Sequence, residues 1–396
     1  MKKNLLIHLF FIVFAAPSFG MEPKQAIQPA NTKSPQASPA KPRIRLTSNF
    51  TENYPDLVKT TYENKNLKSF TAEQFVFSQN KAIESMNAAT ERGANVYLTV
   101  GAHGQNKPTQ YKTTTFKRDP EIHGKITVGL EQSPSKGPSK KGTLLFGSAN
   151  TTNMVWKHNP NKPGAQFNFE SGIEIKDDMD IITDTYKMIK SQSPMKPKAE
   201  KKTIPTTPKK LSLYSSKDTN LNESLALRFN NAAEKGGKAW IRSMTFNDSE
   251  IADELSKLGP NAEIIVDDSA LTKKGIPLLQ KMHDANVSVN IFNPKTGSRA
   301  KQHAKDVIIE TSDKKTYISS TGNLTNQSDE QRNYQLYVPQ NKKLVREAKE
   351  DFEKVKKETI SLPKALELKK QEQERKRKAK PKKSKAIVTK KQKTQK

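Results

Sequence analysis

Two segments of this sequence carry the same combination of chemically useful side chains. The first has His123-x-Lys125, then a lysine-rich stretch and the tetrapeptide Gly-Ser-Ala-Asn. The second has His303-x-Lys305, then a short polar turn and Ser-Thr-Gly-Asn. One such triplet is weak evidence in a chain with six histidines and abundant lysine. Two copies, each followed by a similar tetrapeptide that ends in Asn, predict a functional arrangement that occurs twice.

These residue types suit the cleavage of phosphodiester bonds. Residues two apart in a β-strand point to the same face, so the His and Lys of each triplet can share one cleft. An imidazole can attack phosphorus or protonate a departing oxygen near neutral pH, because its ordinary pKa is about 6.5. Lysine neutralises phosphate oxygens, and hydroxyl and amide groups donate hydrogen bonds to them. The candidates for these neutral contacts are Ser148, Asn150, Thr321 and Asn323. Two facing sets predict a site that works without a metal ion or another cofactor.

The elements that would position these residues alternate between helix and strand. The segment NKAIESMNAATERGANVYLTV predicts a helix that ends near Gly93 and a strand after it. The segment ESLALRFNNAAEKGGKAWI predicts the same unit again, and two further units follow, the first with Asp248 or Ser249 as its helix cap. Each His-x-Lys then leads into a strand, a turn and a second strand. This order predicts an α/β fold with a mixed or parallel sheet, and the similar units predict an internal duplication.

Composition divides the chain into two bodies and three polar segments. Residues 21–45, 192–210 and 363–396 are rich in Lys and poor in apolar periodicity, which predicts a disordered arm, a basic linker and a basic tail. The first half is then 46–191 and the second half 211–362. The formal net charge of +28 resides mostly in the polar segments, so the two halves are nearly neutral. The basic tail predicts binding to an anionic membrane surface or to nucleic acid, and we expect a monomer.

Residues 1–20 resemble a signal peptide. Two lysines precede an apolar run and small residues, which predicts export and a secreted or periplasmic protein. The run is shorter than the roughly 20 residues that span a bilayer, although an uncleaved anchor is an alternative. Met21 as an internal start would instead give a cytoplasmic protein. The absence of cysteine excludes disulfides, thiolate catalysis and cysteine-ligated zinc.

At the two triplets the sequence resembles the phospholipase D superfamily, whose motif is H-x-K-x4-D followed by G-S-x-N. The resemblance covers both halves. It implies two similar α/β halves packed together with the active site at their interface, a phosphohistidine intermediate, and hydrolysis or transfer of a phosphodiester. By the usual order of the family, His123 would be the nucleophile and His303 the general acid, with Lys125, Lys305 and the two asparagines holding phosphate.

The sequence departs from the family pattern at two places. The acidic position of the motif is Glu310 in the second half but Leu130 in the first, where Glu131 follows one residue late and would need a bulge to take the same role. Family members often carry a glutamate that bonds to a catalytic histidine. Glu170 would fill this place, and Gln335 is its expected match in the second half. These differences predict a slower enzyme or one degenerate half.

The resemblance implies a phosphoric diester hydrolase, but it leaves the substrate open. A phospholipid-cleaving enzyme and a nuclease can share every residue named above. Hydrolysis of phospholipid head groups, as in phospholipase D, is our first expectation. A secreted, metal-independent endonuclease is the first alternative. A non-catalytic protein that binds anionic lipid or nucleic acid is the second.

Overall fold

The computed structural model describes residues 42–48, 54–101, 108–151, 168–191, 196, 200–205, 208–294 and 300–379. The predicted signal peptide, nearly all of the arm, much of the linker and the end of the tail lie outside the described residues. None of the helices in the described ranges has the length and apolar character needed to span a bilayer.

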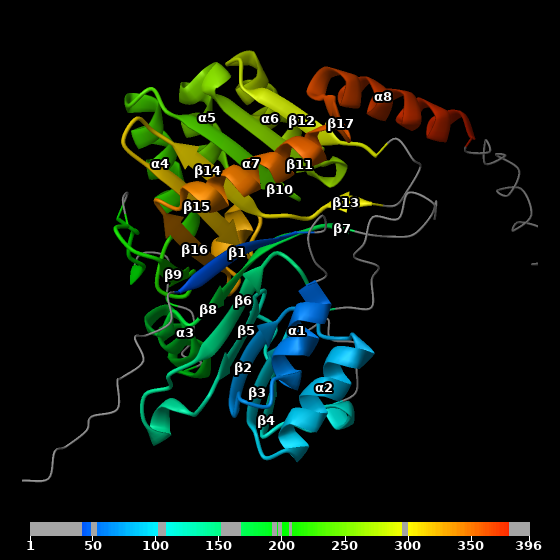
Figure 1. Ribbon diagram of the computed structural model, residues 1–396. Helices are drawn as coiled ribbons and strands as arrows, with labels where there is room; N and C mark the ends of the chain where they lie inside the picture. Colours follow the sequence, from blue (N-terminus) through cyan, green and yellow to red (C-terminus); the bar gives the residue numbers. More distant parts are fainter. Residues whose placement is uncertain are drawn as a thin grey trace, which may run out of the picture. The chain divides into compact units, whose positions relative to one another are not determined.

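The first half forms a seven-stranded mixed sheet (Figure 1). Its strands are β1 (Arg43–Ser48), β2 (Ser69–Gln74), β3 (Asn95–Val100), β4 (Thr115–Arg118), β5 (Lys125–Leu130), β6 (Gly142–Gly147) and β8 (Ser171–Lys176). They lie in the order β1-β8-β6-β5-β2-β3-β4. Strand β2 pairs in parallel with β3 and antiparallel with β5, which continues into the hairpin β5–β6.

The second half repeats this pattern in an eight-stranded sheet. Its strands are β9 (Ser212–Ser215), β10 (Lys238–Ser243), β11 (Ala262–Asp267), β12 (Ser288–Phe292), β14 (Asp306–Glu310), β15 (Lys315–Ser320), β16 (Tyr334–Pro339) and β17 (Thr359–Ser361). The order is β17-β12-β11-β10-β14-β15-β16-β9. Strand β10 pairs in parallel with β11 and antiparallel with β14, as β2 does with β3 and β5. The expected α/β fold with a duplicated mixed sheet is therefore confirmed.

Helices cover the outer faces of both sheets, and the inner faces share one core. The helices are α1 (Tyr54–Glu63), α2 (Asn80–Glu91), α3 (Met179–Ser191), α4 (Leu221–Glu234), α5 (Ser249–Leu258), α6 (Gly275–Asp284), α7 (Lys342–Lys356) and α8 (Leu362–Ala379). Helices α1 and α2 pack on the first sheet, and α4, α5 and α6 pack on the second. The shared core joins side chains such as Val128 and Ile173 to Ile308 and Leu336, with α3 and α7 beside them. Apolar burial thus holds the two halves together.

The predicted helix ends are confirmed at equivalent turns. Gly93 follows α2 with φ +84° and Gly236 follows α4 with φ +61°. This left-handed conformation favours glycine, which explains why RGA and KGG separate each helix from its strand. Asp248 caps α5 by accepting a hydrogen bond from the Ile251 backbone N–H at 3.1 Å.

A buried ionic network connects the end of β1 to the second sheet. Arg242 on β10 is fully buried, and its Nε donates to Asp306 at 2.8 Å while its Nη1 donates to Asp351 of α7 at 2.7 Å. Ser48, the last residue of β1, donates to the other oxygen of Asp351 at 2.9 Å. Asp351 therefore neutralises a buried guanidinium and ties β1 to α7.

We expect the Asp351→Ala variant to lose about 3–5 kcal/mol in its free energy of unfolding, because Arg242 would keep a buried charge with too few partners. Urea denaturation measures this loss. The matched control is Glu350→Ala, which removes the neighbouring carboxylate of α7 from an exposed pair with Arg346. That change should cost no more than about 1 kcal/mol. Equal losses in the two variants would contradict the role given to Asp351.

Candidate active site

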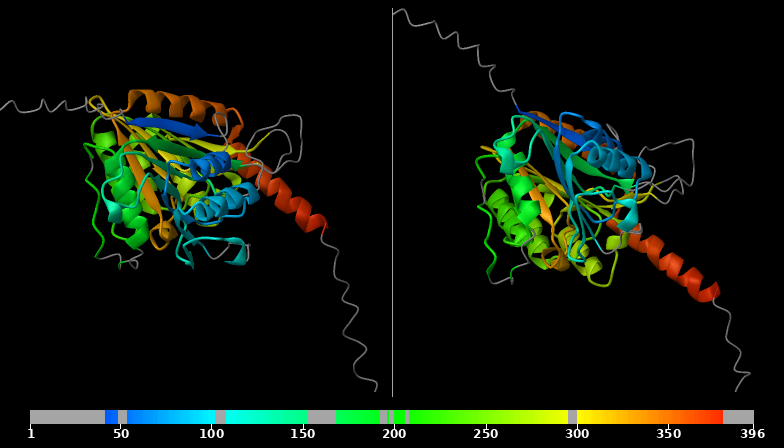
Figure 2. Two further views of the ribbon diagram at one scale, coloured as in Figure 1. Left: turned by 60° about the horizontal axis from the view of Figure 1, so that its bottom comes forward. Right: turned by 90° about the horizontal axis from the view of Figure 1, so that it is seen from below.

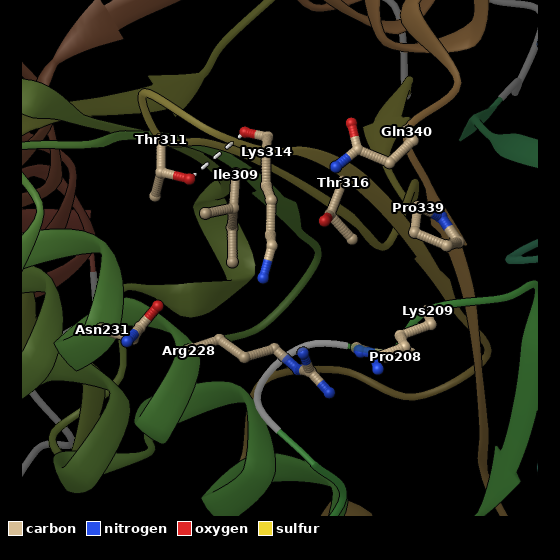
Figure 3. Close-up of a pocket in the computed structure, with 10 residues that line it drawn as sticks. All are labelled: Pro208, Lys209, Arg228, Asn231, Ile309, Thr311, Lys314, Thr316, Pro339 and Gln340. Atoms are coloured by element: carbon tan, nitrogen blue, oxygen red, sulfur yellow. Dashed lines mark hydrogen bonds between the residues drawn. The ribbon is translucent and has the colours of Figure 1, made fainter.

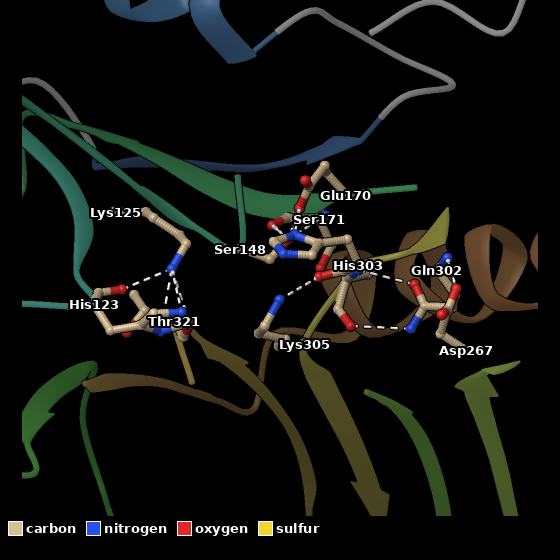
Figure 4. Close-up of polar contacts among 11 residues, drawn as sticks. His123, Lys125, Ser148, Glu170, Ser171, Asp267, Gln302, His303, Lys305 and Thr321 are labelled. Atoms are coloured by element: carbon tan, nitrogen blue, oxygen red, sulfur yellow. Dashed lines mark hydrogen bonds and ion pairs between the residues drawn. The ribbon is translucent and has the colours of Figure 1, made fainter. Parts of the chain in front are cut away.

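Each of the two motif histidines is held by a residue from the opposite half, and Figure 4 shows the contact of His303 with Glu170. Nδ1 of His303 lies 2.8 Å from Oε2 of Glu170, which directly precedes β8. Nδ1 of His123 lies 2.9 Å from Oδ1 of Asn333, which directly precedes β16. The two contacts occupy equivalent positions in the two halves. They differ in the residue that holds the histidine, its holder, which is the carboxylate Glu170 for His303 and the amide Asn333 for His123.

Backbone hydrogen bonds repeat the same exchange between the halves. The His303 N–H donates to the Phe169 carbonyl at 2.8 Å, and the His123 N–H donates to the Arg332 carbonyl at 3.2 Å. The first crossing includes a short parallel ladder between β7 (Asn168–Phe169) and β13 (Lys301–Gln302). Both histidines are thus positioned by main chain and side chain of the other half.

The motif lysines lie next to their histidines in buried positions. Lys125 Nζ donates to the His123 carbonyl at 2.7 Å, and Lys305 Nζ donates to the His303 carbonyl at 2.7 Å. Lys125 also reaches the second half, where its Nζ donates to the Thr321 carbonyl at 3.3 Å. Figure 4 shows both His-Lys sets close to one another. The structure therefore brings together the four side chains that the sequence singled out as catalytic.

The motif hydroxyls bind the residues that hold the imidazoles. Ser148 Oγ donates to Glu170 Oε2 at 2.6 Å, and Thr321 Oγ1 donates to Asn333 Oδ1 at 3.2 Å. These contacts give the hydroxyls a positioning role, and their expected contact with phosphate stays a prediction.

The motif asparagines are candidates for direct contact with phosphate. The side-chain oxygens of Asn150 and Asn323 are buried and have no hydrogen-bond partner within the described residues. The oxygen and nitrogen of an amide exchange places by rotation, so either group can face a ligand. That both asparagines hold phosphate stays a prediction.

The expected match between Gln335 and Glu170 is wrong. Gln335 lies within β16, where it accepts a hydrogen bond from the Tyr337 hydroxyl at 2.6 Å. Asn333, two residues earlier, occupies the place that Glu170 has in the first half. The expected match was two residues out of step, because the contacts that define this position run between the halves.

Glu310 lies at the far end of β14 and does not reach the histidines. Its carboxylate pairs with Lys315 at 3.1 Å and with Lys349 at 3.2 Å. Leu130 occupies the corresponding end of β5 and is buried in the shared core. No bulge brings Glu131 into this place, because β5 and β6 pair in regular register and the Glu131 N–H donates to the Lys141 carbonyl at 3.1 Å just beyond the strand. The replacement of the acidic residue by Leu130 therefore affects packing in the core and not the surroundings of the imidazoles.

Two carboxylates that the sequence did not single out support the histidine segments. Asp267 accepts from the Gln302 N–H at 2.9 Å, next to His303. Glu73 pairs with Arg332 at 3.3 Å, next to the holder of His123. The only signal was a polar residue near the carboxyl end of each parallel strand, in SFTAEQ and AEIIVD. Among the described residues, no three His, Asp or Glu side chains are grouped as a metal site.

The electrostatic environments of the two imidazoles differ. Burial, together with Lys125 and Lys305, places the pKa of His123 well below its ordinary value. Burial also lowers the pKa of His303, but the Glu170 carboxylate opposes this effect. Burial lowers the pKa of Lys305 to about 8 and that of Lys125 well below its ordinary value. His123 is therefore the better neutral imidazole, and His303 the better imidazolium.

Solved structures share this architecture at low sequence identity. Phosphatidylserine synthase from Haemophilus influenzae Rd KW20 matches with a TM-score of 0.55 and 12% identity over 85% of this chain and 94% of that chain. Polyphosphate kinase from Porphyromonas gingivalis matches with a TM-score of 0.57 and 14% identity over 78% of this chain. The match covers 46% of the kinase, so this chain spans less than half of its length.

Comparison at the sequence level gives no match to a family model and none to a curated protein. The two structures are both of the phospholipase D superfamily. This chain has two similar α/β halves whose sheets pack together. Each half contributes one His-Lys pair to the site. The protein therefore has a phospholipase D-like fold.

Proposed function

We propose that the protein cleaves phosphodiester bonds through a phosphohistidine, with His123 as nucleophile and His303 as general acid. The observation that carries this proposal is that each imidazole is bound by a residue of the opposite half, His123 by an amide and His303 by a carboxylate. An amide oxygen on Nδ1 of His123 fixes the proton there and leaves a lone pair on Nε2. A carboxylate on Nδ1 of His303 favours the imidazolium, whose Nε2–H can be donated.

The reaction proceeds in two balanced steps. Nε2 of His123 attacks phosphorus, the bond to the leaving alcohol breaks, and its oxygen takes the proton from His303. Neutral His303 then removes a proton from water, the water oxygen attacks phosphorus, and the P–N bond breaks. Lys125 and Lys305 neutralise the non-bridging oxygens, which carry charge in both steps. An alcohol in place of water would give transfer instead of hydrolysis.

We propose phospholipid head groups as the substrate, cleaved in the periplasm or outside the cell. The fold-level likeness to phosphatidylserine synthase, which extends over nearly all of that protein, supports a lipid phosphodiester. The basic segments add attraction to an anionic membrane, where each Lys or Arg near the surface contributes about 1 kcal/mol. This charge would keep the enzyme at its substrate.

An endonuclease is the second candidate, and the character of α8 favours it. The first turns of this helix bury Leu362 and Ala365 in the core, but beyond Lys369 it is exposed and polar on every side. Lysine and arginine are frequent in this exposed part, and in both views of Figure 2 it projects away from the two sheets. A helix that is polar on every side does not insert into lipid, but it can follow a charged phosphate backbone.

Parallel assays distinguish these candidates. We expect the purified protein without its predicted signal peptide to release the head group from phosphatidylcholine or cardiolipin vesicles in EDTA buffer. Cleavage of single- or double-stranded DNA with intact lipid would replace this proposal by the nuclease. Binding to vesicles or DNA without any cleavage, unchanged in His123→Ala and His303→Ala, would identify a non-catalytic binder. Deletion from residue 369 should weaken vesicle binding but leave the turnover of soluble bis(p-nitrophenyl) phosphate unchanged.

A further inference from the structure

A polar cavity lies beside the end of β14 that is farther from His303, and Figure 3 shows the residues that line it. It has a volume of about 270 Å³. Its walls come from α4, the turn between β14 and β15, the end of β16 and the segment that precedes β9. His303 precedes the first residue of β14, whereas Ile309 and Thr311 line the cavity at the opposite end of that strand. The cavity is therefore separate from the active site.

The lining of this cavity is cationic. Lys209, Arg228 and Lys314 contribute to it, and none of its ten described lining residues is acidic. In Figure 3 the Lys314 ammonium and the Arg228 guanidinium extend toward the same open space. The nearby carboxylate of Asp313 lies 3.5 Å from Lys235 Nζ and 3.8 Å from Lys314 Nζ. One adjacent carboxylate cannot balance three cations, so the cavity carries a net positive charge.

Arg228 is held in place before any ligand arrives. The residue is 5% exposed, its guanidinium lies 4.3 Å from the centre of the Tyr337 ring, and its Nη2 donates to the Pro205 carbonyl. A buried, stacked guanidinium loses little conformational freedom on binding an anion, and its hydrogen bonds are strong because water is excluded. The site thus has a preformed anchor.

The other lining groups complete an anion site of limited size. Asn231, Thr316 and Gln340 offer neutral hydrogen bonds, and Ile309 and Pro339 provide an apolar wall. The volume lies just below the range of about 300–1,000 Å³ that is usual for ligand pockets. A phosphate or diphosphate group with a small organic part fits this space, whereas a polymer does not.

We propose that this cavity binds the phosphate groups of a small phosphorylated molecule, at a second site apart from the catalytic histidines. Lys209 and Lys314 lie at its entrance and neutralise the phosphate oxygens. Arg228 binds them at the base through its planar fork. The ligand would contact α4 and the β14–β15 turn, which belong to the same half as His303.

Isothermal titration calorimetry with pyrophosphate, AMP and glycerol 3-phosphate tests this site. The catalytic cleft also attracts phosphate, so the titrations use the Lys125→Ala/Lys305→Ala background. We expect at least one of the three probes to bind in this background. Adding Lys209→Ala/Lys314→Ala should weaken that binding by about tenfold or more, since two charge-assisted contacts are lost. The probe that shows this dependence identifies the source of the phosphate.

The matched control is Lys136→Ala/Lys140→Ala, which removes two exposed lysines from the equivalent β5–β6 hairpin of the first half. It should change the affinity less than twofold. Arg228→Lys keeps the charge but loses the planar fork, so it should also weaken binding. Absence of binding by all three probes in the background, or equal effects of the two lysine pairs, would overturn the proposal. These results do not depend on catalytic activity, so a failure here is distinct from a failure of the proposed reaction.

Discussion

His123→Ala and His303→Ala are each expected to lower kcat/KM by roughly 10⁴-fold or more in EDTA buffer for a phosphodiester whose leaving group is an alcohol such as choline. The first change removes the nucleophile, and the second leaves the departing oxygen without a proton donor. The control is His283→Ala, a half-buried histidine of α6 outside the site, which should change kcat/KM less than twofold.

A labelled substrate separates the roles of the two histidines. With ³²P-phosphodiester, the quenched enzyme should carry an acid-labile, base-stable phosphate on His123. His303→Ala should still form this adduct when the leaving group is p-nitrophenol, because such a leaving group needs little protonation. Label on His303 would reverse the assignment of nucleophile and acid. Undiminished activity in both alanine variants would rule out the histidine mechanism itself.

Glu170→Gln is expected to lower kcat/KM at pH 7 by about 10- to 100-fold, as is common for residues that hold a catalytic group. The free enzyme needs neutral His123 and protonated His303, so its pH profile should be bell-shaped. Activity falls at high pH as His303 loses its proton. Without the negative charge of Glu170 the imidazolium is less stable, the pKa of His303 falls, and this limb moves to lower pH.

Two further variants test the specificity of this effect. Asn333→Asp adds a negative charge beside His123, raises its pKa and should move the low-pH limb to higher pH. Glu174→Gln is the matched control, because Glu174 is a buried carboxylate of the same strand β8 that pairs with Arg45 and Lys176. It should leave both limbs in place. An unmoved high-pH limb in Glu170→Gln would show that Glu170 does not set the protonation of His303.

The parts of the fold with strong local signals were predictable. The α2–β3 and α4–β10 units have periodic apolar residues and a glycine at the turn, and both were found as expected. Strand β1 shows the limit, since Arg43–Ser48 begins inside the segment predicted to be a disordered arm. Its polar start conceals a strand that is formed by main-chain pairing with β8 and by the ion pair of Arg45 with Glu174. Pairing partners more than a hundred residues away leave no local pattern.

The same reasoning explains the outcome at the site. His123, Lys125, His303 and Lys305 were found because rare chemistry and repeated spacing mark them. Asn333 was missed because its role comes from a contact with a histidine 210 residues away. An asparagine has no distinctive type, and only the backbone crossing between the halves places it beside the imidazole.

The exchange of holders between the halves has a consequence for specialisation after a duplication. Two identical halves would produce two identical histidines, and a site of that kind has no built-in direction. Here the two halves differ at one position outside both motifs. Glu170 contacts His303 with a carboxylate, whereas Asn333 contacts His123 with an amide, and this difference gives the two histidines unequal basicity. Because each holder acts on the opposite half, neither half can acquire its own division of labour by itself. The different roles of the two histidines therefore depend on both halves together. Sequence changes in one half are tolerated only if Glu170 and Asn333 still contact the histidines of the opposite halves.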